Sequence, residues 1–281
     1  MHDVHAAVTT PTPTFTPEMQ RMRSGGYSIE RGVLTAAEID ELKRAVQAHF
    51  RTKGRTQYGG RIQLRGLHAV PEVSRVLLSD AIIEVMRRHT PDGHVLLTGE
   101  CDLMMNTTSG WHKDVTSDMR MGNAIFADPD FAVYKLAIYL QDQDEGSIAA
   151  FRVRPGTQRM ADGDAVPAER LETQAGDVVV FDVRMDHAGQ PPNLMTRMLR
   201  RQLGLIAPPL GLDQERMLTG IRARLPGPDR LAVFMTFGPD TPATRAYAAA
   251  GQHRHGPAPA PLSAGAEAAL HRPGLAMIPV N

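Results

Sequence analysis

The sequence Trp111-His112-Lys113-Asp114 lies among the short strands that follow a helical N-terminal part. Successive side chains of an extended strand point to opposite faces, so His112 and Asp114 can present an imidazole and a carboxylate to one point. Lys113 between them must face the other way. Two imidazoles and one carboxylate on one side of a metal ion leave adjacent positions open, which is the arrangement of non-haem Fe(II) oxygenases. His187, which follows a strongly apolar run, is the candidate for the second imidazole.

Short strands surround this stretch on both sides. Five short runs are expected to be strands: residues 95–100, 102–106, 132–140, 151–154 and 178–183. The last run is too apolar to alternate, so we expect it to be buried on both faces. Strands of this length with turn residues between them predict an antiparallel sandwich or barrel, with a core over about residues 94–206.

Helices are expected before the strands. Thr35-Ala36-Ala37-Glu38 has the capping-box pattern, and apolar residues follow it at helical spacing as far as Phe50. Residues 71–88 carry the apolar side of a second helix. Residues 1–24 are polar, contain several prolines and show no periodicity, so we expect a disordered leader there. Residues 25–281 are expected to form one domain.

The part of the chain after His187 is expected to add one strand and then helices. As a strand, residues 196–205 would place Arg197 and Arg201 on one face. An arginine on the inward face of a barrel is costly unless it meets an anion, and a dicarboxylate cosubstrate would supply one. Residues 208–281 are expected to be a C-terminal helical extension. Within it, we interpret His253-Arg254-His255 as a solvated segment because of its Pro, Ala and Gly setting.

Composition limits the classes of partner. The 31 basic and 31 acidic residues cancel, so nothing in the charge balance favours nucleic acid or an anionic membrane, and a small-molecule substrate is expected. Cys101 is the single cysteine, which excludes an intrachain disulfide and a cysteine-based zinc site and agrees with a reducing compartment. No signal peptide and no apolar run of roughly 20 residues is present, so we predict a cytoplasmic protein without a membrane span.

Three elements together resemble the phytanoyl-CoA dioxygenase family of Fe(II)/2-oxoglutarate oxygenases. They are Trp111-His112-Lys113-Asp114, the turn Arg154-Pro155-Gly156-Thr157, and Gly176-Asp177-Val178-Val179-Val180-Phe181-Asp182 leading to His187. The resemblance runs from about residue 26 to about residue 205. It implies a mainly β fold with flanking α-helices, built on a double-stranded β-helix, which is a cupin-like jelly-roll core.

The resemblance also implies a chemistry. Fe(II) would be held by His112, Asp114 and His187, which would be both the metal ligands and the catalytic centre, and 2-oxoglutarate and O2 would be cosubstrates. Conversion of 2-oxoglutarate to succinate and CO2 would accompany hydroxylation of an unactivated C–H bond in an anionic or polar small molecule. Halogenases of this type lack the carboxylate ligand, so Asp114 favours hydroxylation.

Residues that hold 2-oxoglutarate are implied in the same way. Arg197 follows His187 by ten residues, where the family places the arginine that pairs with the far carboxylate. The family often has a hydroxyl side chain two residues after the distal histidine, where this chain has Gly189, so another donor has to substitute. The candidates for that donor are Tyr134, Lys135 and Thr107. Arg65 is the candidate for a basic residue that the family uses upstream of the metal motif.

A different class of protein stays open at this stage. A jelly-roll metal-binding protein, or a non-oxidative metalloenzyme, could keep the metal site without turning over 2-oxoglutarate. Arg197 separates the two, because a protein that does not use 2-oxoglutarate has no evident reason to place a cation there. A zinc hydrolase is disfavoured because the sequence has no helical HExxH motif. The identity of the substrate and the oligomeric state are not defined by the sequence.

Overall fold

Two β-sheets form the centre of the protein. The computed structural model describes residues 16–115, 124–144, 150–224 and 227–280. The larger sheet has eight strands in the order β1-β8-β5-β10-β4-β3-β2, with β11 paired parallel to β4. Its strands are β1 (Tyr27–Glu30), β2 (Arg55–Gln57), β3 (Gly60–Gln63), β4 (Val95–Met105), β5 (Tyr134–Tyr139), β8 (Val178–Asp182), β10 (Leu231–Gly238) and β11 (Leu275–Met277). The smaller sheet consists of β7 (Glu169–Leu171), β6 (Phe151–Val153) and β9 (His187–Ala188).

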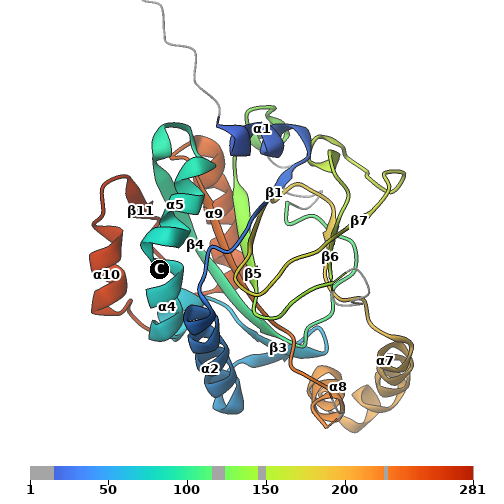
Figure 1. The fold of residues 1–281 in the computed structure, drawn as a ribbon. Coiled ribbons are helices and arrows are strands. Elements are labelled where there is room, and N and C mark those ends of the chain that lie inside the picture. Colours follow the sequence, from blue (N-terminus) through green and yellow to red (C-terminus); the bar gives the residue numbers. More distant parts are fainter. Residues whose placement is uncertain (1–15, 116–123, 145–149, 225–226, 281) are drawn as a thin grey trace, which may run out of the picture.

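Helices cover one face of the larger sheet, and the smaller sheet packs on the other (Figure 1). The helices are α1 (Pro17–Ser24), α2 (Ala36–Thr52), α3 (Gly66–Ala69), α4 (Pro71–Leu77), α5 (Asp80–Arg88), α7 (Leu194–Ile206), α8 (Gln214–Arg222), α9 (Pro242–His255) and α10 (Ala264–Leu270). Short 3-10 turns occur at η1 (Pro91–Gly93), η2 (Ala124–Ala127), η3 (Thr157–Arg159) and η4 (Pro208–Leu210). Within the described ranges, no helix combines the length and the apolar character that crossing a bilayer requires.

Strand alternation divides β5 between two cores. Leu136 faces the helical side and packs in one cluster with Leu42 of α2. Its neighbour Ala137 faces the other way and packs in a second cluster with Phe151 and Val153 of the smaller sheet. Because successive strand residues point to opposite faces, one apolar strand serves both layers. The expected mainly β jelly-roll core with flanking helices is therefore confirmed.

Of the N-terminal elements predicted from the sequence, helix α2 is observed as predicted, and the others are observed only in part. The Thr35 side chain accepts from the Glu38 backbone, and the Glu38 side chain accepts from the Thr35 backbone, which is the expected capping box. The helix expected over residues 71–88 is two helices, because the backbone is extended at Ser79. The leader expected to be disordered over residues 1–24 is helical at Pro17–Ser24, where the Thr16 hydroxyl caps α1. Residues 1–15 lie outside the described part.

The chain after His187 departs most from the sequence prediction. Residues 196–205 belong to helix α7 and not to a strand. The Asn193 side chain caps this helix by accepting from the Thr196 N–H at 2.7 Å, and the Leu, Met, Arg and Gln residues that follow are good helix formers. The C-terminal part is not only helical, because β10 lies between β5 and β4 in the large sheet. The β core therefore extends beyond residues 94–206.

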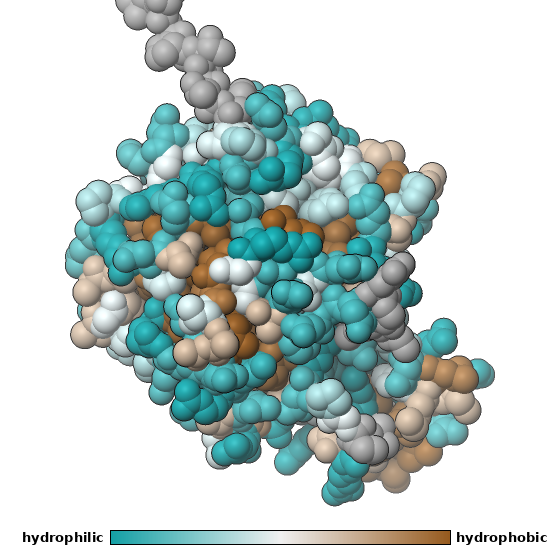
Figure 2. Space-filling view, in the orientation of Figure 1, coloured by the Kyte–Doolittle hydropathy of each residue, from teal (hydrophilic) through white to brown (hydrophobic). Residues whose placement is uncertain are grey.

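The inserted segment with α7 and η4 exposes apolar side chains. Figure 2 shows them gathered where α7 and α8 project from the body of the protein. The large apolar residues exposed in this segment are Leu194, Met195, Met198, Leu205, Ile206, Leu210 and Leu212.

One long strand, β4, replaces the two strands expected at residues 95–106. Gly99 has a φ of +80°, and the pairing of β4 with β10 shifts register between Met235 and Phe237, opposite this glycine. A residue in the left-handed region at such a bulge is most easily a glycine. The bulge lets the strand continue while Glu100 and Asp102 line a cavity and Cys101 between them packs against the helices.

Candidate metal centre and its cavity

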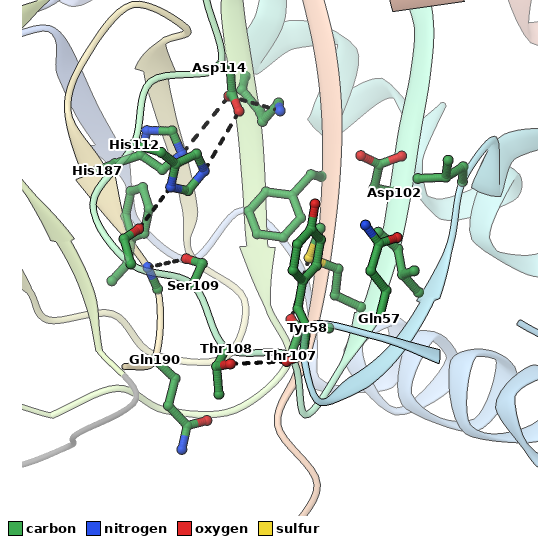
Figure 3. Close-up of a pocket in the computed structure, with 18 of the residues that line it drawn as sticks. Gln57, Tyr58, Asp102, Thr107, Thr108, Ser109, His112, Asp114, His187 and Gln190 are labelled. Atoms are coloured by element: carbon green, nitrogen blue, oxygen red, sulfur yellow. Dashed lines mark hydrogen bonds and ion pairs between the residues drawn. The ribbon is translucent and has the colours of Figure 1, made fainter. Parts of the chain in front are cut away.

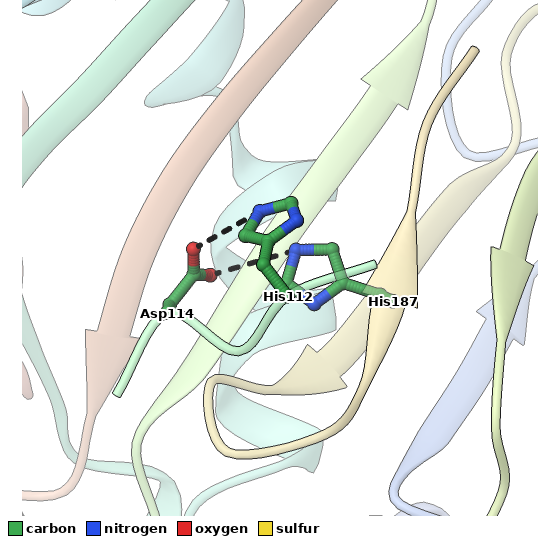
Figure 4. A group of neighbouring side chains, drawn as sticks. All are labelled: His112, Asp114 and His187. Atoms are coloured by element: carbon green, nitrogen blue, oxygen red, sulfur yellow. Dashed lines mark ion pairs between the residues drawn. The ribbon is translucent and has the colours of Figure 1, made fainter. Parts of the chain in front are cut away.

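His112, Asp114 and His187 come together at the end of the jelly-roll core (Figure 4). The backbones of the two histidines form a β-bridge, in which each N–H donates to the carbonyl of the other at 3.0 Å. The Asp114 N–H donates to the Val183 carbonyl at 2.9 Å, which ties the loop to the end of β8. The two carboxylate oxygens lie 3.9 and 4.0 Å from the Nε2 atoms of His112 and His187. Three residues far apart in sequence thus offer one ligand atom each to a single point.

The backbone decides which histidine nitrogens can bind a metal. Nδ1 of His112 lies 2.9 Å from the Gly110 carbonyl oxygen, and Nδ1 of His187 lies 3.0 Å from the Met185 carbonyl oxygen. A ring nitrogen facing a carbonyl carries the proton and donates it, which leaves the lone pair on Nε2. Both Nε2 atoms face Asp114. The donor set is therefore two imidazole Nε2 atoms and one carboxylate, which fits the facial arrangement of non-haem Fe(II) sites.

Electrostatics keep these ligands in the forms that bind metal. Burial alone would raise the pKa of Asp114, but Lys135, whose Nζ is 2.9 Å from Oδ2, and the two imidazoles hold it well below its usual range. Burial and the neighbouring His112 lower the pKa of His187 to about 3. The carboxylate is charged and the His187 imidazole is neutral at physiological pH, so neither must lose a proton to bind a cation.

The metal centre forms one side of a cavity of about 890 Å³ between the two sheets. Figure 3 shows His112, Asp114 and His187 on one side and Asp102 and Gln57 on the other. This volume is sufficient for a small molecule together with a cosubstrate.

Two of the residues expected to hold 2-oxoglutarate line this cavity, and three do not. Lys135 and Thr107 are part of the lining. Arg65 is buried elsewhere and donates to the carbonyl oxygens of Gly99 and Gly256. Tyr134 is buried in the helical core, where its ring packs on Phe237. His112, Asp114 and His187, which are the predicted metal ligands, also line the cavity.

Arg197 is placed differently from its prediction. It lies on the exposed side of helix α7 and is not part of the cavity lining. The expectation that a strand would turn its guanidinium inward is wrong, because the segment is helical and stands apart from both sheets.

Arg230 is the arginine that sequence reasoning missed. It directly precedes β10, lines the cavity, and places its guanidinium 5.2 Å from the centre of the Tyr139 ring. Its backbone is fixed on both sides by Asn106, through the Arg230 N–H to Oδ1 at 2.8 Å and the Asn106 N–H to the Arg230 carbonyl at 2.9 Å. Burial lowers the pKa of Arg230, and the contact with Tyr139 opposes that shift. The sequence feature that could have identified Arg230 is its position at the start of the apolar run that forms β10. Helices α7 and α8 separate it from His187, so a search close to His187 does not reach it.

Ser109 is a second missed residue, and it explains Gly189. The Gly189 N–H donates to Ser109 Oγ at 2.9 Å. A Cβ added at Gly189 would lie 3.1 Å from that oxygen and 3.6 Å from a terminal nitrogen of Arg230. The serine hydroxyl therefore occupies the place that a side chain two residues after His187 would reach. The Ser109 hydroxyl and the Arg230 guanidinium thus both lie near the Cβ position of Gly189, two residues from His187.

His255 corrects one more interpretation. It was expected in a solvated segment, but it lines the cavity, with Nδ1 3.2 Å from Glu100 Oε1 and Nε2 3.7 Å from Asp102 Oδ2. Helix α9, which ends at this residue, packs along β4 and carries the imidazole to the cavity.

The fold and the site together define a jelly-roll protein with a two-histidine, one-carboxylate centre that can hold a metal ion. Solved structures similar to this chain include non-haem, α-ketoglutarate-dependent enzymes. One is SnoN, an α-ketoglutarate-dependent epimerase from nogalamycin biosynthesis, with 15% identity over 80% of this chain and 82% of that chain and a TM-score of 0.55.

Two further structures come from Streptomyces. HygX from Streptomyces hygroscopicus, solved with nickel and 2-oxoglutarate bound, has 13% identity over 81% of this chain and 88% of that chain, with a TM-score of 0.53. AviO1 from Streptomyces viridochromogenes Tue57 has 18% identity over 83% of this chain and 98% of that chain, also with a TM-score of 0.53. At these identities the likeness is one of fold. No model of a protein family and no curated protein matches the chain, so the phytanoyl-CoA dioxygenase family in particular is not established.

Proposed function

We propose that this protein is an Fe(II)- and 2-oxoglutarate-dependent oxygenase that acts on a small molecule. The observation that carries the proposal is the convergence of two Nε2 lone pairs and the Asp114 carboxylate on one point of a large cavity. Several structures of the same fold are of 2-oxoglutarate-dependent enzymes, and HygX was solved with nickel and 2-oxoglutarate bound.

Each residue of the centre has a distinct part in this proposal. His112, Asp114 and His187 would hold Fe(II), which when bound supplies oxidation of the substrate by O2 coupled to conversion of 2-oxoglutarate to succinate and CO2. Lys135 pairs with Oδ2 of Asp114 at 2.9 Å and fixes the orientation of the carboxylate. Lys135 is therefore a positioning residue, while Thr107 contributes to the cavity wall.

Arg230 and Ser109 are the residues we propose for the cosubstrate, in place of Arg197 and Tyr134. The guanidinium of Arg230 can pair with the far carboxylate of 2-oxoglutarate, and the Ser109 hydroxyl can donate to the same group. Both reach the space beside Gly189, two residues from a metal ligand. The alternative of a non-oxidative metal protein gives no role to a guanidinium in this position.

Hydroxylation of a C–H bond is the outcome we propose for the reaction. The fold does not choose the outcome, because similar structures include the epimerase SnoN, the carbocyclase SnoK and the monooxygenase ThoJ. The presence of Asp114 favours transfer of oxygen over halogenation, since the third metal position is occupied by a carboxylate. The single, buried Cys101 agrees with a cytoplasmic location.

Anaerobic titration of 2-oxoglutarate into the Fe(II)-loaded protein tests the proposal without a known substrate. Chelation at the open positions of the centre gives a visible metal-to-ligand charge-transfer band, and admission of O2 then gives succinate. His112→Ala should lose both signals because it removes an imidazole ligand, and His271→Ala, at an exposed imidazole, is the matched control that should keep them. A folded, iron-loaded protein that shows neither band nor succinate would favour the non-oxidative alternative.

A further inference from the structure

The cavity wall opposite the metal centre carries two carboxylates. Glu100 and Asp102 are both on β4 and both line the cavity, while Cys101 between them is buried among the helices. A buried carboxylate is costly unless hydrogen bonds or opposite charges compensate it. Hydrogen bonds from the protein offset the cost of burial for Glu100 much more than for Asp102.

Glu100 is held by its neighbours. Its Oε2 atom accepts from the hydroxyls of Thr236 and Tyr247, each at 3.2 Å. Its Oε1 atom lies 3.2 Å from His255 Nδ1, and a Cβ at Gly251 would overlap that oxygen. Glu100 is therefore clamped between β4, β10 and helix α9.

Asp102 is not compensated in this way. Its side chain is only 10% exposed, and among the described residues Oδ1 has no hydrogen-bond partner. Its Oδ2 atom is 3.7 Å from His255 Nε2, beyond hydrogen-bond distance. Burial raises the pKa of Asp102. Figure 3 shows this carboxylate on the cavity side of β4, beside Gln57. The missing partner of Oδ1 is thus a donor that enters the cavity.

The charges around Asp102 favour a cation as that donor. Lys135 is bonded to Asp114, and Arg65 points to the carbonyl oxygens of Gly99 and Gly256. The carboxylates of Glu100 and Asp114 add negative charge near Asp102, and Lys135, whose charge opposes theirs, is paired with Asp114. An ammonium group would balance the remaining negative charge and bring up to three hydrogen-bond donors.

We propose that Asp102 recognises a protonated amine of the substrate, and that the substrate is therefore a polar, amine-bearing small molecule. This inference rests on the proposed function for the reaction and adds the class of substrate. His255 lies beside both Glu100 and Asp102 on this side of the cavity. The proposal narrows the expectation of an anionic or polar substrate to a polar one that carries an amine.

Binding of a matched pair of probes tests the inference. Glucosamine and glucose differ in one amine, and calorimetric titration of each into the protein loaded with Ni(II) and 2-oxoglutarate compares them directly. We expect glucosamine to bind about 10- to 100-fold more tightly, the range for a hydrogen bond to a charged group. The isosteric Asp102→Asn should remove this preference, and Asp240→Asn on the surface should keep it. Equal binding of the two sugars by the unaltered protein, or a preference that survives Asp102→Asn, would overturn the inference.

The two proposals fail in different ways. A charge-transfer band with Fe(II) and 2-oxoglutarate, together with equal binding of the two sugars, would leave the oxygenase standing and remove the amine. If the band is missing but the protein prefers glucosamine in a way that depends on Asp102, the amine site would stand and the oxygenase proposal would fall. If Asp102→Asn does not fold, the comparison of the two sugars on the unaltered protein still decides the outcome.

Discussion

Replacing Arg230 by glutamine should weaken binding of 2-oxoglutarate while leaving the metal centre in place. Glutamine removes the charge and the forked donors but keeps a polar side chain of moderate length. The backbone bonds between Arg230 and Asn106 do not use the side chain and should persist. The ring of Tyr139, which lies 5.2 Å from the guanidinium, would lose one contact.

The size of the effect follows from the setting of the guanidinium. Truncating one partner of a buried, hydrogen-bonded charge pair costs about 2–5 kcal/mol. Since about 1.4 kcal/mol corresponds to a factor of ten, the dissociation constant of 2-oxoglutarate should rise about 30- to 3000-fold. We expect a rise near the lower end of this range for two reasons. Arg230 is only partly shielded from solvent, and the Ser109 hydroxyl, which also lies near Gly189, is still present in the variant.

Arg197 supplies the matched control. It is exposed on α7, so Arg197→Gln should leave the dissociation constant within about twofold, as surface changes usually do. Both constants can be read from the charge-transfer band in anaerobic titrations, with metal content measured in parallel. The reasoning would be refuted if Arg197→Gln weakened 2-oxoglutarate binding and Arg230→Gln did not.

Three further results are expected. Ser109→Ala should weaken 2-oxoglutarate binding about tenfold, and adding Gly189→Ser should restore much of it; titrations that show no rescue would count against the shared position. The metal-free protein should lose stability as pH falls from about 6.5 towards 3, because the unfolded chain then binds a proton that folded His187 does not, at most about 5 kcal/mol. Urea midpoints across that range should change less for His187→Asn, and an identical slope would contradict this origin. Ni(II) at about 100 times its dissociation constant should add about 2.7 kcal/mol to the free energy of unfolding, and His112→Ala should abolish that gain in thermal melts.

Helix α7 shows why a local pattern misled the assignment of the cosubstrate arginine. Residues 196–205 alternate charged and apolar side chains well enough to suggest a strand, and Arg197 stood at the spacing the resemblance required. The Asn193 cap and the helix-forming residues after it decide otherwise. The strand that completes the sheet is β10, which begins at Leu231, directly after Arg230. An insertion of two helices is invisible to a rule based on spacing.

The sequence by itself determined the elements that depend on near neighbours. The capping box of α2, the apolar run of β8, and the pairing of His112 with Asp114 all follow from periodicity and local hydrogen bonding. His187 was within reach because it lies only five residues beyond the end of β8, and a strand end limits where the next residues can lie.

Only the tertiary structure decided which distant groups share the cavity. Arg230 beside Gly189, Ser109 in the place of a missing side chain, and His255 beside Asp102 each join segments that are remote in sequence. The physical reason is that sheet order and the path of helix α9 set these contacts, and neither leaves a periodic trace in the residues involved. Long-range pairing brings the charges together, so the chemistry of the cavity can be read only from the folded chain.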